Sequence, residues 1–398
     1  MRDLSIVMPC LNEAKTIGIC IQKAKESIAR LGVDGEIVVA DNGSTDGSIE
    51  IATELGARVL QIEEKGYGNA LRGGIEAAEG KWIIMGDADD SYDFGNIVPF
   101  IEKLKDGADL VMGCRLPRGG GQIMPGAMPW KHRWIGNPAL SWVGRLFFES
   151  CVTDFHCGMR AFTRAGYQRM GLRTTGMEFA SEMVIKATML GMRVAEIPIT
   201  LYRDGRDRAP HLRSWRDGWR HLRFMLLYSP DWLFMVPGVL FLLIGFSFGA
   251  RLQLGPWKVG PFGFDTNTLL VCSMLQVVGL QVSFFGMFAR LFATSEGLLP
   301  NNPGPLSKLL KYFNLERGII LGLAIFLVGL IKLIQAVLYW KAAQFGAISY
   351  PESLRQVIPA VTLIMMGVQV IFSSFFLSIL DIPRKSGEIS PSFSDGWK

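Results

Sequence analysis

The amino-acid sequence predicts an α/β domain followed by a domain of four membrane-spanning helices, on the basis of two patterns. Up to residue 113, short apolar runs alternate with segments in which apolar residues recur every three or four positions, as expected for strands alternating with helices. Beyond residue 230 the sequence contains four long apolar runs. Strands that are apolar on both faces and alternate with helices indicate a parallel sheet covered on both sides.

Five short apolar runs supply the predicted strands of the first domain. The helix after the first run is predicted from apolar residues at helical spacing between Ile17 and Leu31, and Gly32 is expected to end it. The strands are predicted at residues 4–8, 36–40, 57–62, 81–86 and 108–113. Because ligands of parallel sheets collect at the carboxyl ends of the strands, the functional site is expected in the loops that follow them.

Carboxylates gather where the fourth strand ends, in the stretch GDADDSYD. Asp87 and Asp89 are two residues apart, so both side chains point to one face if the strand continues through them. Clustered carboxylate oxygens suit Mg²⁺ or Mn²⁺, which in turn neutralises a diphosphate. A Walker-type glycine motif is absent, so phosphates would be held through metal and side chains. A solvated acidic turn is the alternative interpretation.

The composition limits how many domains and which kinds of cysteine site the chain can contain. With 398 residues, 49% of them hydrophobic and 19% charged, the chain is long enough for one large domain and a second one. Its six cysteines form no C-x-x-C pair, so neither a disulfide framework nor a zinc site is indicated.

Six short motifs carry a resemblance to a known family. In order along residues 4–228 they read VMPCLNE, VVADNGSTDGS, KGYGNAL, MGDADD, VMGCR and DFHCGMRAF. This order resembles the family-2 glycosyltransferases with a GT-A (Rossmann-like) fold, most closely the dolichol-phosphate mannose synthase and polyprenyl-phosphate glucosyltransferase branch. The resemblance implies a nucleotide-sugar domain, then an interfacial amphipathic helix and a four-helix transmembrane domain.

The resemblance implies which residues hold the donor. Asp87 and Asp89 match the family's D-x-D motif, with Asp89 the more direct metal ligand. Where relatives often carry Gln or His shortly after this motif, the chain has DSY, which leaves a further metal ligand unassigned. The other implied nucleotide-sugar positions are Pro9, Asn12, Glu13, Asp41 and Lys65.

The resemblance also implies a site for the phosphate of a lipid acceptor. Arg115 and Arg133 flank the glycine-rich stretch Arg118–Trp130, which has no helix or strand pattern and is interpreted as a lid. Both arginines fall where polyprenyl-phosphate enzymes grip the acceptor phosphate, and guanidinium geometry suits that role. Arg206 and Arg208 lie in a basic segment that the family places near the donor diphosphate or the acceptor, and pure headgroup binding is equally open for them.

Asp154 completes the catalytic set with Asp89 and Arg115. The family offers this position, in TDFHCGMR, as a base or acceptor orienter, and the alternative is that it positions Arg160 or the lid. A phosphate monoester has a second pKa of about 6, so a phosphate acceptor is already anionic and needs no strong base. Metal stabilisation of the leaving diphosphate and positioning are expected to carry most of the catalysis.

The four apolar runs are each long enough to cross a hydrocarbon core. The segment Arg203–Arg223 before them holds seven arginines against three aspartates, which places the first domain in the cytoplasm by the positive-inside rule. The spans are predicted at residues 232–250, 266–289, 318–340 and 356–380. The chain is thereby divided into a cytoplasmic glycosyltransferase domain (1–205), juxtamembrane amphipathic helices (206–230), a transmembrane domain (231–383) and a cytoplasmic tail (384–398).

A membrane-surface helix is predicted just before the first span. Tryptophans and leucines share one face and arginines form an adjacent stripe, as in helices that lie in the headgroup layer. These residues are Trp215, Trp219, Leu222 and Leu226, and Arg216, Arg220 and Arg223.

The sequence and the resemblance together predict an inverting, metal-dependent transfer of glucose or mannose from a UDP- or GDP-linked donor to undecaprenyl or dolichyl phosphate. One alternative is a glycolipid synthase with a lipid hydroxyl acceptor, which would need a true base and make Asp154 indispensable. Another is a non-enzymatic membrane protein that binds sugar nucleotides. The expected partners are the donor, the lipid acceptor and the membrane, without nucleic acid, and the sequence leaves homo-oligomerisation open.

Overall fold

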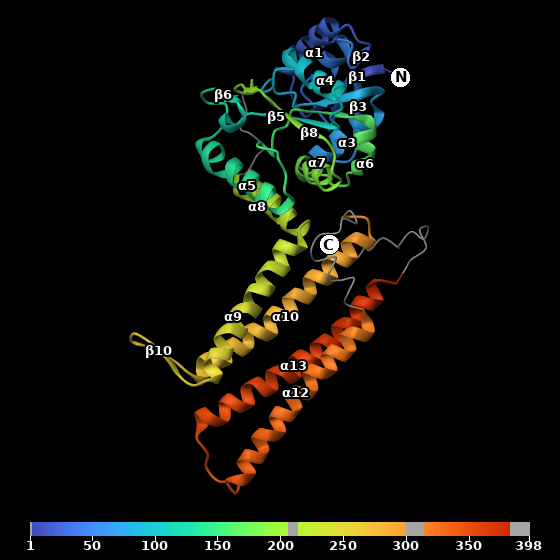
Figure 1. Ribbon diagram of the computed structural model, residues 1–398. Coiled ribbons are helices and arrows are strands. Elements are labelled where there is room, and N and C mark those ends of the chain that lie inside the picture. The colour runs from blue at the N-terminus through green and yellow to red at the C-terminus, as the bar shows by residue number, and fades with distance from the viewer. Residues whose placement is uncertain (1, 206–213, 300–313, 383–398) are drawn as a thin grey trace. The chain divides into compact units, whose positions relative to one another are not determined.

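The computed structural model describes residues 2–205, 214–299 and 314–382, and the chain divides into two compact units (Figure 1). The first unit, an α/β domain, ends at Ser229, and the second, made of long helices, begins at Pro230. The candidate acceptor residues Arg206 and Arg208 lie outside the described residues, as does the tail predicted at 384–398.

The first unit is built on a seven-stranded sheet with the order β3-β2-β1-β4-β7-β5-β8. All five strands predicted from the sequence are present as β1 to β5. The neighbours from β3 to β4 are parallel, as are β5 and β8. The strands are β1 (Arg2–Cys10), β2 (Gly35–Asp41), β3 (Arg58–Gln61), β4 (Gly80–Met85), β5 (Leu110–Cys114), β7 (Arg160–Thr163) and β8 (Val194–Pro198).

The prediction of a wholly parallel sheet is wrong at β7, which runs antiparallel to both of its neighbours, β4 and β5. Arg160 is in register with Met85 at the end of β4 and with Met112 of β5. A long excursion, residues 115–159, precedes β7 in place of a strand–helix–strand crossover, so the connection does not impose a parallel direction. The inverted strand brings the segment before it, residues 154–159, to the edge where β4 and β5 end.

Helices cover both faces of the sheet (Figure 1). Helix α3 packs on β1 and β2, and α4 packs on β5, β7 and β8. The predicted end of the first helix is confirmed, because Gly32 caps α1 with a φ of 61°, a left-handed conformation that glycine adopts readily. The covering helices include α1 (Ile17–Leu31), α2 (Ser48–Glu54), α3 (Tyr67–Ala77), α4 (Val98–Lys105), α6 (Arg164–Met170) and α7 (Glu178–Met189).

Within residues 230–299 and 314–382, the described part of the second unit, four helices are long and apolar enough to cross a membrane, one at each predicted span. The first begins as the π-helical turn η4 (Asp231–Met235) and continues as α9, and a hairpin of β10 (Trp257–Val259) and β11 (Phe262–Phe264) connects it to α10. The helices are α9 (Val236–Gln253), α10 (Thr266–Ser295), α12 (Leu315–Ala342) and α13 (Tyr350–Leu380).

Glycines let these helices approach closely in pairs. A Cβ atom on Gly279 of α10 would lie 2.7 Å from the carbonyl oxygen of Gly238 in α9. One on Gly367 of α13 would lie 2.6 Å from the backbone nitrogen of Phe326 and 2.7 Å from the carbonyl oxygen of Gly322 in α12. Small residues at such contacts are the usual way in which membrane helices pack.

Replacing Gly367 by leucine is expected to separate α12 from α13, because the new side chain meets backbone atoms that cannot rotate away. Overpacking of this kind destabilises by about 1–3 kcal/mol. Thermal unfolding of purified protein in detergent checks the prediction, with Val368→Leu as the control, since Val368 is 38% exposed on the next position of the same helix. Equal melting temperatures for the two variants would contradict the packing described.

Candidate active site

The loops after β1, β2, β3 and β4 lie along one edge of the sheet, as parallel neighbours require. They comprise residues 11–16, 42–47, 62–66 and 86–93. The segment before the antiparallel strand β7 reaches the same edge. The predicted donor residues and Asp154 therefore lie at one edge of the sheet.

Asn12 and Glu13 tie the first loop to the second. Asn12 has a φ of 58°, in the left-handed region, and its Oδ1 accepts a hydrogen bond from the backbone N–H of Thr45 at 2.8 Å. The backbone N–H of Asn12 donates to Oγ of Ser44, and that of Glu13 donates to Oγ of Ser48, each at 2.8 Å. These bonds fix the two loops against each other without a ligand.

Asp41 and Pro9 lie at the ends of neighbouring strands. The Asp41 side chain is 1% exposed, and its carboxylate accepts hydrogen bonds from the backbone N–H groups of Gly43 at 2.8 Å and of Ser44 at 3.1 and 3.2 Å. Pro9 pairs in register with Ala40, the residue before Asp41. Asp41 thus shapes the loop that follows it.

Asn42 joins the second loop to the third, and the sequence analysis missed it. Its Nδ2 donates to the carbonyl oxygens of Ile62 at 3.1 Å and Glu64 at 2.9 Å, and its Oδ1 accepts from the backbone N–H of Gly66 at 2.8 Å. Lys65 Nζ donates to the Asn42 carbonyl at 2.6 Å. The signal was an asparagine opening a loop rich in glycine and serine, where such side chains bond to backbone groups.

The D-x-D carboxylates lie in a loop, because β4 ends at Met85 and does not continue through them. The one-face arrangement that depended on such a strand is therefore replaced by loop contacts. Asp87 Oδ1 accepts a hydrogen bond from the Tyr67 hydroxyl at 2.9 Å. Asp89 is 7% exposed, and its Oδ1 accepts from the backbone N–H of Ser91 at 3.1 Å and from its hydroxyl at 2.6 Å.

The other two carboxylates of the stretch stabilise the turn. Asp90 has a φ of 59° and pairs with Lys23 Nζ at 2.7 Å. Asp93 caps the short helix η1 (Phe94–Asn96) by accepting from the backbone N–H of Gly95 at 2.9 Å. Asp90 and Asp93 are thus engaged in local structure.

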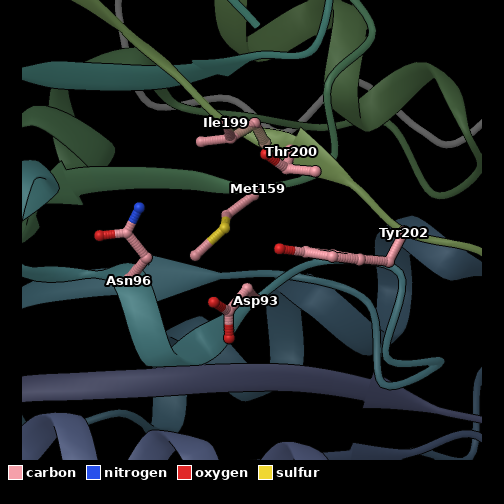
Figure 2. Close-up of a pocket in the computed structure, with 6 residues that line it drawn as sticks. All are labelled: Asp93, Asn96, Met159, Ile199, Thr200 and Tyr202. Carbon is pink, nitrogen blue, oxygen red and sulfur yellow. The ribbon is translucent and has the colours of Figure 1, made fainter. Parts of the chain in front are cut away.

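A pocket lies beside the D-x-D loop (Figure 2). The backbone N–H of Tyr202 donates to the Ser91 carbonyl at 3.0 Å, so one wall of the pocket is tied to that loop. None of the predicted site residues that the structure describes lines it. Its lining is Asp93, Asn96, Met159, Ile199, Thr200 and Tyr202.

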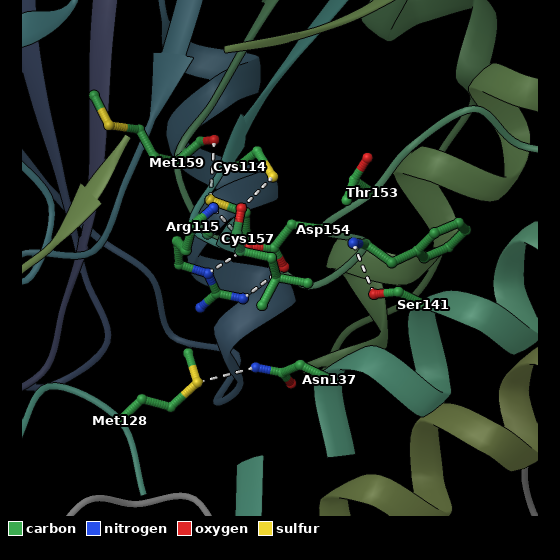
Figure 3. Close-up of polar contacts among 12 residues, drawn as sticks. Cys114, Arg115, Met128, Asn137, Ser141, Thr153, Asp154, Cys157 and Met159 are labelled. Atoms are coloured by element: carbon green, nitrogen blue, oxygen red, sulfur yellow. Dashed lines mark hydrogen bonds and ion pairs between the residues drawn. The ribbon is translucent and has the colours of Figure 1, made fainter. Parts of the chain in front are cut away.

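Arg115 and Asp154, which the sequence assigned to separate roles, form a buried ion pair (Figure 3). Arg115 Nε lies 2.7 Å from Asp154 Oδ2, and Nη2 lies 2.8 Å from Oδ1. The backbone N–H of Arg115 also donates to Oδ2, at 3.0 Å. The two residues are 7% and 0% exposed, so the pair is bidentate and almost fully removed from water.

Each partner keeps the other charged. Burial would raise the pKa of the Asp154 carboxyl, but the charge and hydrogen bonds of Arg115 outweigh burial and hold that pKa below its usual value. Burial likewise would lower the pKa of Arg115, which Asp154 instead raises well above its usual value. A carboxylate whose pKa is depressed in this way is a poor general base near neutral pH.

The segment between Arg115 and Asp154 contains regular elements, including the strand β6 within the glycine-rich stretch that was expected to have neither helix nor strand. Its strand β6 pairs in parallel with β9 (Thr200–Leu201). Arg133 lies in η3, with its guanidinium 5.3 Å from the centre of the Trp134 ring. Among the described residues, no hydrogen bond or ion pair joins Arg133 to Arg115 or Asp154. The elements are η2 (Pro117–Gly119), β6 (Gln122–Ile123), η3 (His132–Gly136) and α5 (Asn137–Phe148).

Exposed tryptophans lie on this segment and on α8 (Ser214–Leu227), which contacts α5. They are Trp130, Trp134, Trp142 and Trp219, which are 64%, 59%, 57% and 58% exposed. The helix α8 was predicted from the sequence, and α5, which carries Trp142, was not.

The predicted arginine stripe of α8 is partly turned toward the domain. Arg220 Nε lies 2.8 Å from Glu178 Oε1 at the start of α7, so this arginine joins α8 to the α/β domain. Leu222 and Leu226 are half-buried. The side chains of Trp215 and Arg216 lie outside the described residues.

Comparison with known proteins identifies the family. The model of glycosyl transferase family 2 matches residues 5–175, and that of the glycosyltransferase family 2 C-terminal transmembrane region matches residues 287–381. The low-salt glycan biosynthesis hexosyltransferase Agl6 of Haloferax volcanii is 36% identical over 95% of this chain and 89% of its own length.

Two further proteins are similar over shorter stretches. A dolichyl-phosphate hexose transferase of the same organism is 32% identical over 50% of this chain and 82% of its own length. The solved structure of glucosyl-3-phosphoglycerate synthase from Mycobacterium tuberculosis, in complex with Mn²⁺, UDP and glucosyl-3-phosphoglycerate, has 21% identity and a TM-score of 0.43, covering 56% of this chain and 79% of that chain. From its relatives and its two family regions, the chain belongs to glycosyltransferase family 2, as a member with a transmembrane region.

Proposed function

We propose that this glycosyltransferase moves a hexose, glucose or mannose, from a UDP- or GDP-linked donor to the phosphate of undecaprenyl or dolichyl phosphate, with inversion at the anomeric carbon. The observation that carries the choice of acceptor is the buried Arg115–Asp154 ion pair, because it leaves Asp154 unsuited to act as a base. A phosphate acceptor needs no base, since its second pKa is about 6. A lipid hydroxyl would need one.

The proposed reaction is a single displacement. A phosphate oxygen of the acceptor attacks the anomeric carbon, the bond from that carbon to the diphosphate oxygen breaks, and the nucleoside diphosphate leaves with the electron pair. Attack opposite the leaving group inverts the configuration. The chain's task is to hold both substrates in line and to stabilise the charge on the leaving group.

The donor is assigned to the interlocked loops after β1, β2 and β3. Their predicted ligands are Pro9, Asn12, Glu13, Asp41 and Lys65. Because Asn12, Glu13 and Asp41 already hold these loops together through backbone hydrogen bonds, the base and ribose would meet a surface formed in advance. Such preorganisation lowers the entropy lost on binding.

A divalent cation, Mg²⁺ or Mn²⁺, is proposed at Asp87 and Asp89, with Asp89 the more direct ligand. Among residues 2–205, 214–299 and 314–382, no group of three or more His, Cys, Asp or Glu side chains could hold a metal. Two carboxylates fit a cation that also takes oxygens from the donor diphosphate, the usual arrangement for Mg²⁺. Bound there, the cation would neutralise charge on the leaving diphosphate.

The acceptor side is proposed to face the membrane. Tryptophans are enriched at membrane–water interfaces, which fits the exposed tryptophans of η3, α5 and α8. Arg133 lies next to one of them, Trp134. Arg133 and Arg115 are proposed to contact the acceptor phosphate, as are Arg206 and Arg208 on sequence grounds. The dolichyl-phosphate hexose transferase relative supports a polyprenyl acceptor. The arginine-rich segment 203–223 supports a cytoplasmic active site.

Incubating the purified protein with polyprenyl phosphate, Mg²⁺ or Mn²⁺, and a panel of UDP- and GDP-hexoses is expected to give a lipid product heavier by one hexose in mass spectrometry.

Asp89→Asn is expected to reduce turnover at least about a hundredfold, because metal stabilisation supplies several kcal/mol. Asp106→Asn is the control, since that side chain is 72% exposed. Full turnover in Asp89→Asn would rule out the D-x-D assignment.

The pH dependence of kcat/KM is expected to reflect the ionisation of the acceptor phosphate and not that of Asp154. Protonation of the lipid phosphate should lower kcat/KM for the acceptor as the pH falls below about 6. Because the pKa of Asp154 is below its usual value, the ion pair's contribution to stability is present above that usual value and is lost only as the pH falls through the lower, folded pKa. Melting temperatures measured between about pH 5 and pH 8 should therefore show no step from this pair. A profile that stays flat below pH 6 would argue against a phosphate acceptor.

A further inference from the structure

Two tyrosine hydroxyls contact predicted site residues, that of Tyr67 the donor carboxylate Asp87 and that of Tyr92 the acceptor arginine Arg115, and no predicted role includes them. Tyr67, the first residue of α3, donates its hydroxyl hydrogen to Asp87 Oδ1 at 2.9 Å. Tyr92, 3% exposed, accepts hydrogen bonds at its hydroxyl oxygen from the backbone N–H of Gly158 at 2.9 Å and from Arg115 Nη1 at 3.3 Å.

Gly158 lies against both the Asp87 carboxylate and the Tyr92 phenol. A Cβ atom on Gly158 would lie 2.9 Å from Asp87 Oδ2 and 3.1 Å from the Tyr92 hydroxyl oxygen. The Asp87 carboxylate and the Tyr92 phenol therefore both pack against this one backbone position. Asp87, Gly158, Tyr92, Arg115 and Asp154 form a continuous row from the donor side to the acceptor side.

Contacts with backbone groups hold this row of residues at Gly158 and at Tyr92. Arg160 is fully buried and donates to the carbonyl oxygens of Cys157 at 2.8 Å and Phe155 at 3.2 Å, and also to that of Ala180. These bonds fix the segment that carries Gly158. On the other side, the backbone of Tyr92 forms a β-bridge with Leu201. The segment that carries Gly158 and the backbone of Tyr92 are therefore each held by contacts with other parts of the domain.

Tyr92 and Asp154 contact different nitrogens of the Arg115 guanidinium. Arg115 gives Nε and Nη2 to Asp154 and turns Nη1 to the Tyr92 hydroxyl. A phenol ionises only at about pH 10, so both hydroxyls are protonated near neutral pH. Each is thus a fixed neutral dipole beside a charged group.

We propose that Tyr67 and Tyr92 are positioning residues with separate tasks, Tyr67 orienting Asp87 for the nucleotide–metal complex and Tyr92 orienting Arg115 for the acceptor phosphate. The acceptor half of this proposal rests on the function proposed above. A phenylalanine at either position keeps the ring and removes only the hydroxyl, so the two tasks can be tested one at a time.

The test measures two constants for each variant of the full-length protein. The first is the dissociation constant of UDP and of GDP with Mn²⁺, by titration calorimetry without acceptor. The second is KM for polyprenyl phosphate. Tyr67→Phe is expected to weaken nucleotide binding about tenfold, or about 1.4 kcal/mol, and to leave the acceptor KM within about twofold. Tyr92→Phe is expected to raise the acceptor KM about tenfold and to leave nucleotide binding within about twofold.

Tyr167→Phe is the matched control, because Tyr167 stacks on Phe162 with ring centres 5.7 Å apart, in the same domain. It should leave both constants unchanged. Equal shifts of both constants in Tyr67→Phe and Tyr92→Phe would show general loosening and overturn the proposal, and so would no shift in either. A wild-type protein that binds nucleotide with Mn²⁺ yet transfers no hexose to polyprenyl phosphate would instead overturn the proposed function. The role proposed for Tyr92 would fall with it, and the role proposed for Tyr67 would stand.

Discussion

The buried ion pair between Arg115 and Asp154 is the interaction on which the acceptor side of the site depends. Both charges are almost fully removed from water, and only bidentate geometry with further hydrogen bonds offsets that desolvation. The pair joins residues 39 positions apart, the end of β5 and the segment before β7. It therefore closes the excursion that contains η2, β6, η3 and α5. Removing one partner from such a pair typically destabilises a protein by about 3–5 kcal/mol.

The same pair links the fold to the chemistry. The antiparallel direction of β7 brings Asp154 to the edge of the sheet where β4 ends and the D-x-D loop begins, so the proposed donor and acceptor groups lie at one edge of the sheet. Once Asp154 is bound to Arg115, the site holds a fixed cation beside the proposed acceptor phosphate and a carboxylate that does not take up a proton near neutral pH. Positioning and charge stabilisation are then the contributions that remain for the protein to make.

Local patterns in the sequence predicted much of this arrangement. The strands β1 to β5 and the four long helices followed from periodicity and run length, which depend only on neighbouring residues. The strand β7 was not predicted, and its antiparallel direction depends on tertiary structure and not on neighbouring residues. The Arg115–Asp154 contact joins two motifs distant in sequence, so each residue alone suggested a separate role. Asp90 and Asp93 matched an acidic cluster, and only the contacts with Lys23 and Gly95 showed their structural use.

In the proposed mechanism, Asp154 holds Arg115 and takes no proton from the acceptor. The most direct test is the turnover of Asp154→Asn, measured above pH 7 and normalised to the folded fraction of the variant. We expect a rate within about tenfold of the wild type, because asparagine can still accept a hydrogen bond from Arg115. A loss of about 10²–10⁴-fold in folded protein, the usual contribution of a general base, would show that Asp154 acts as a base and would favour a hydroxyl acceptor.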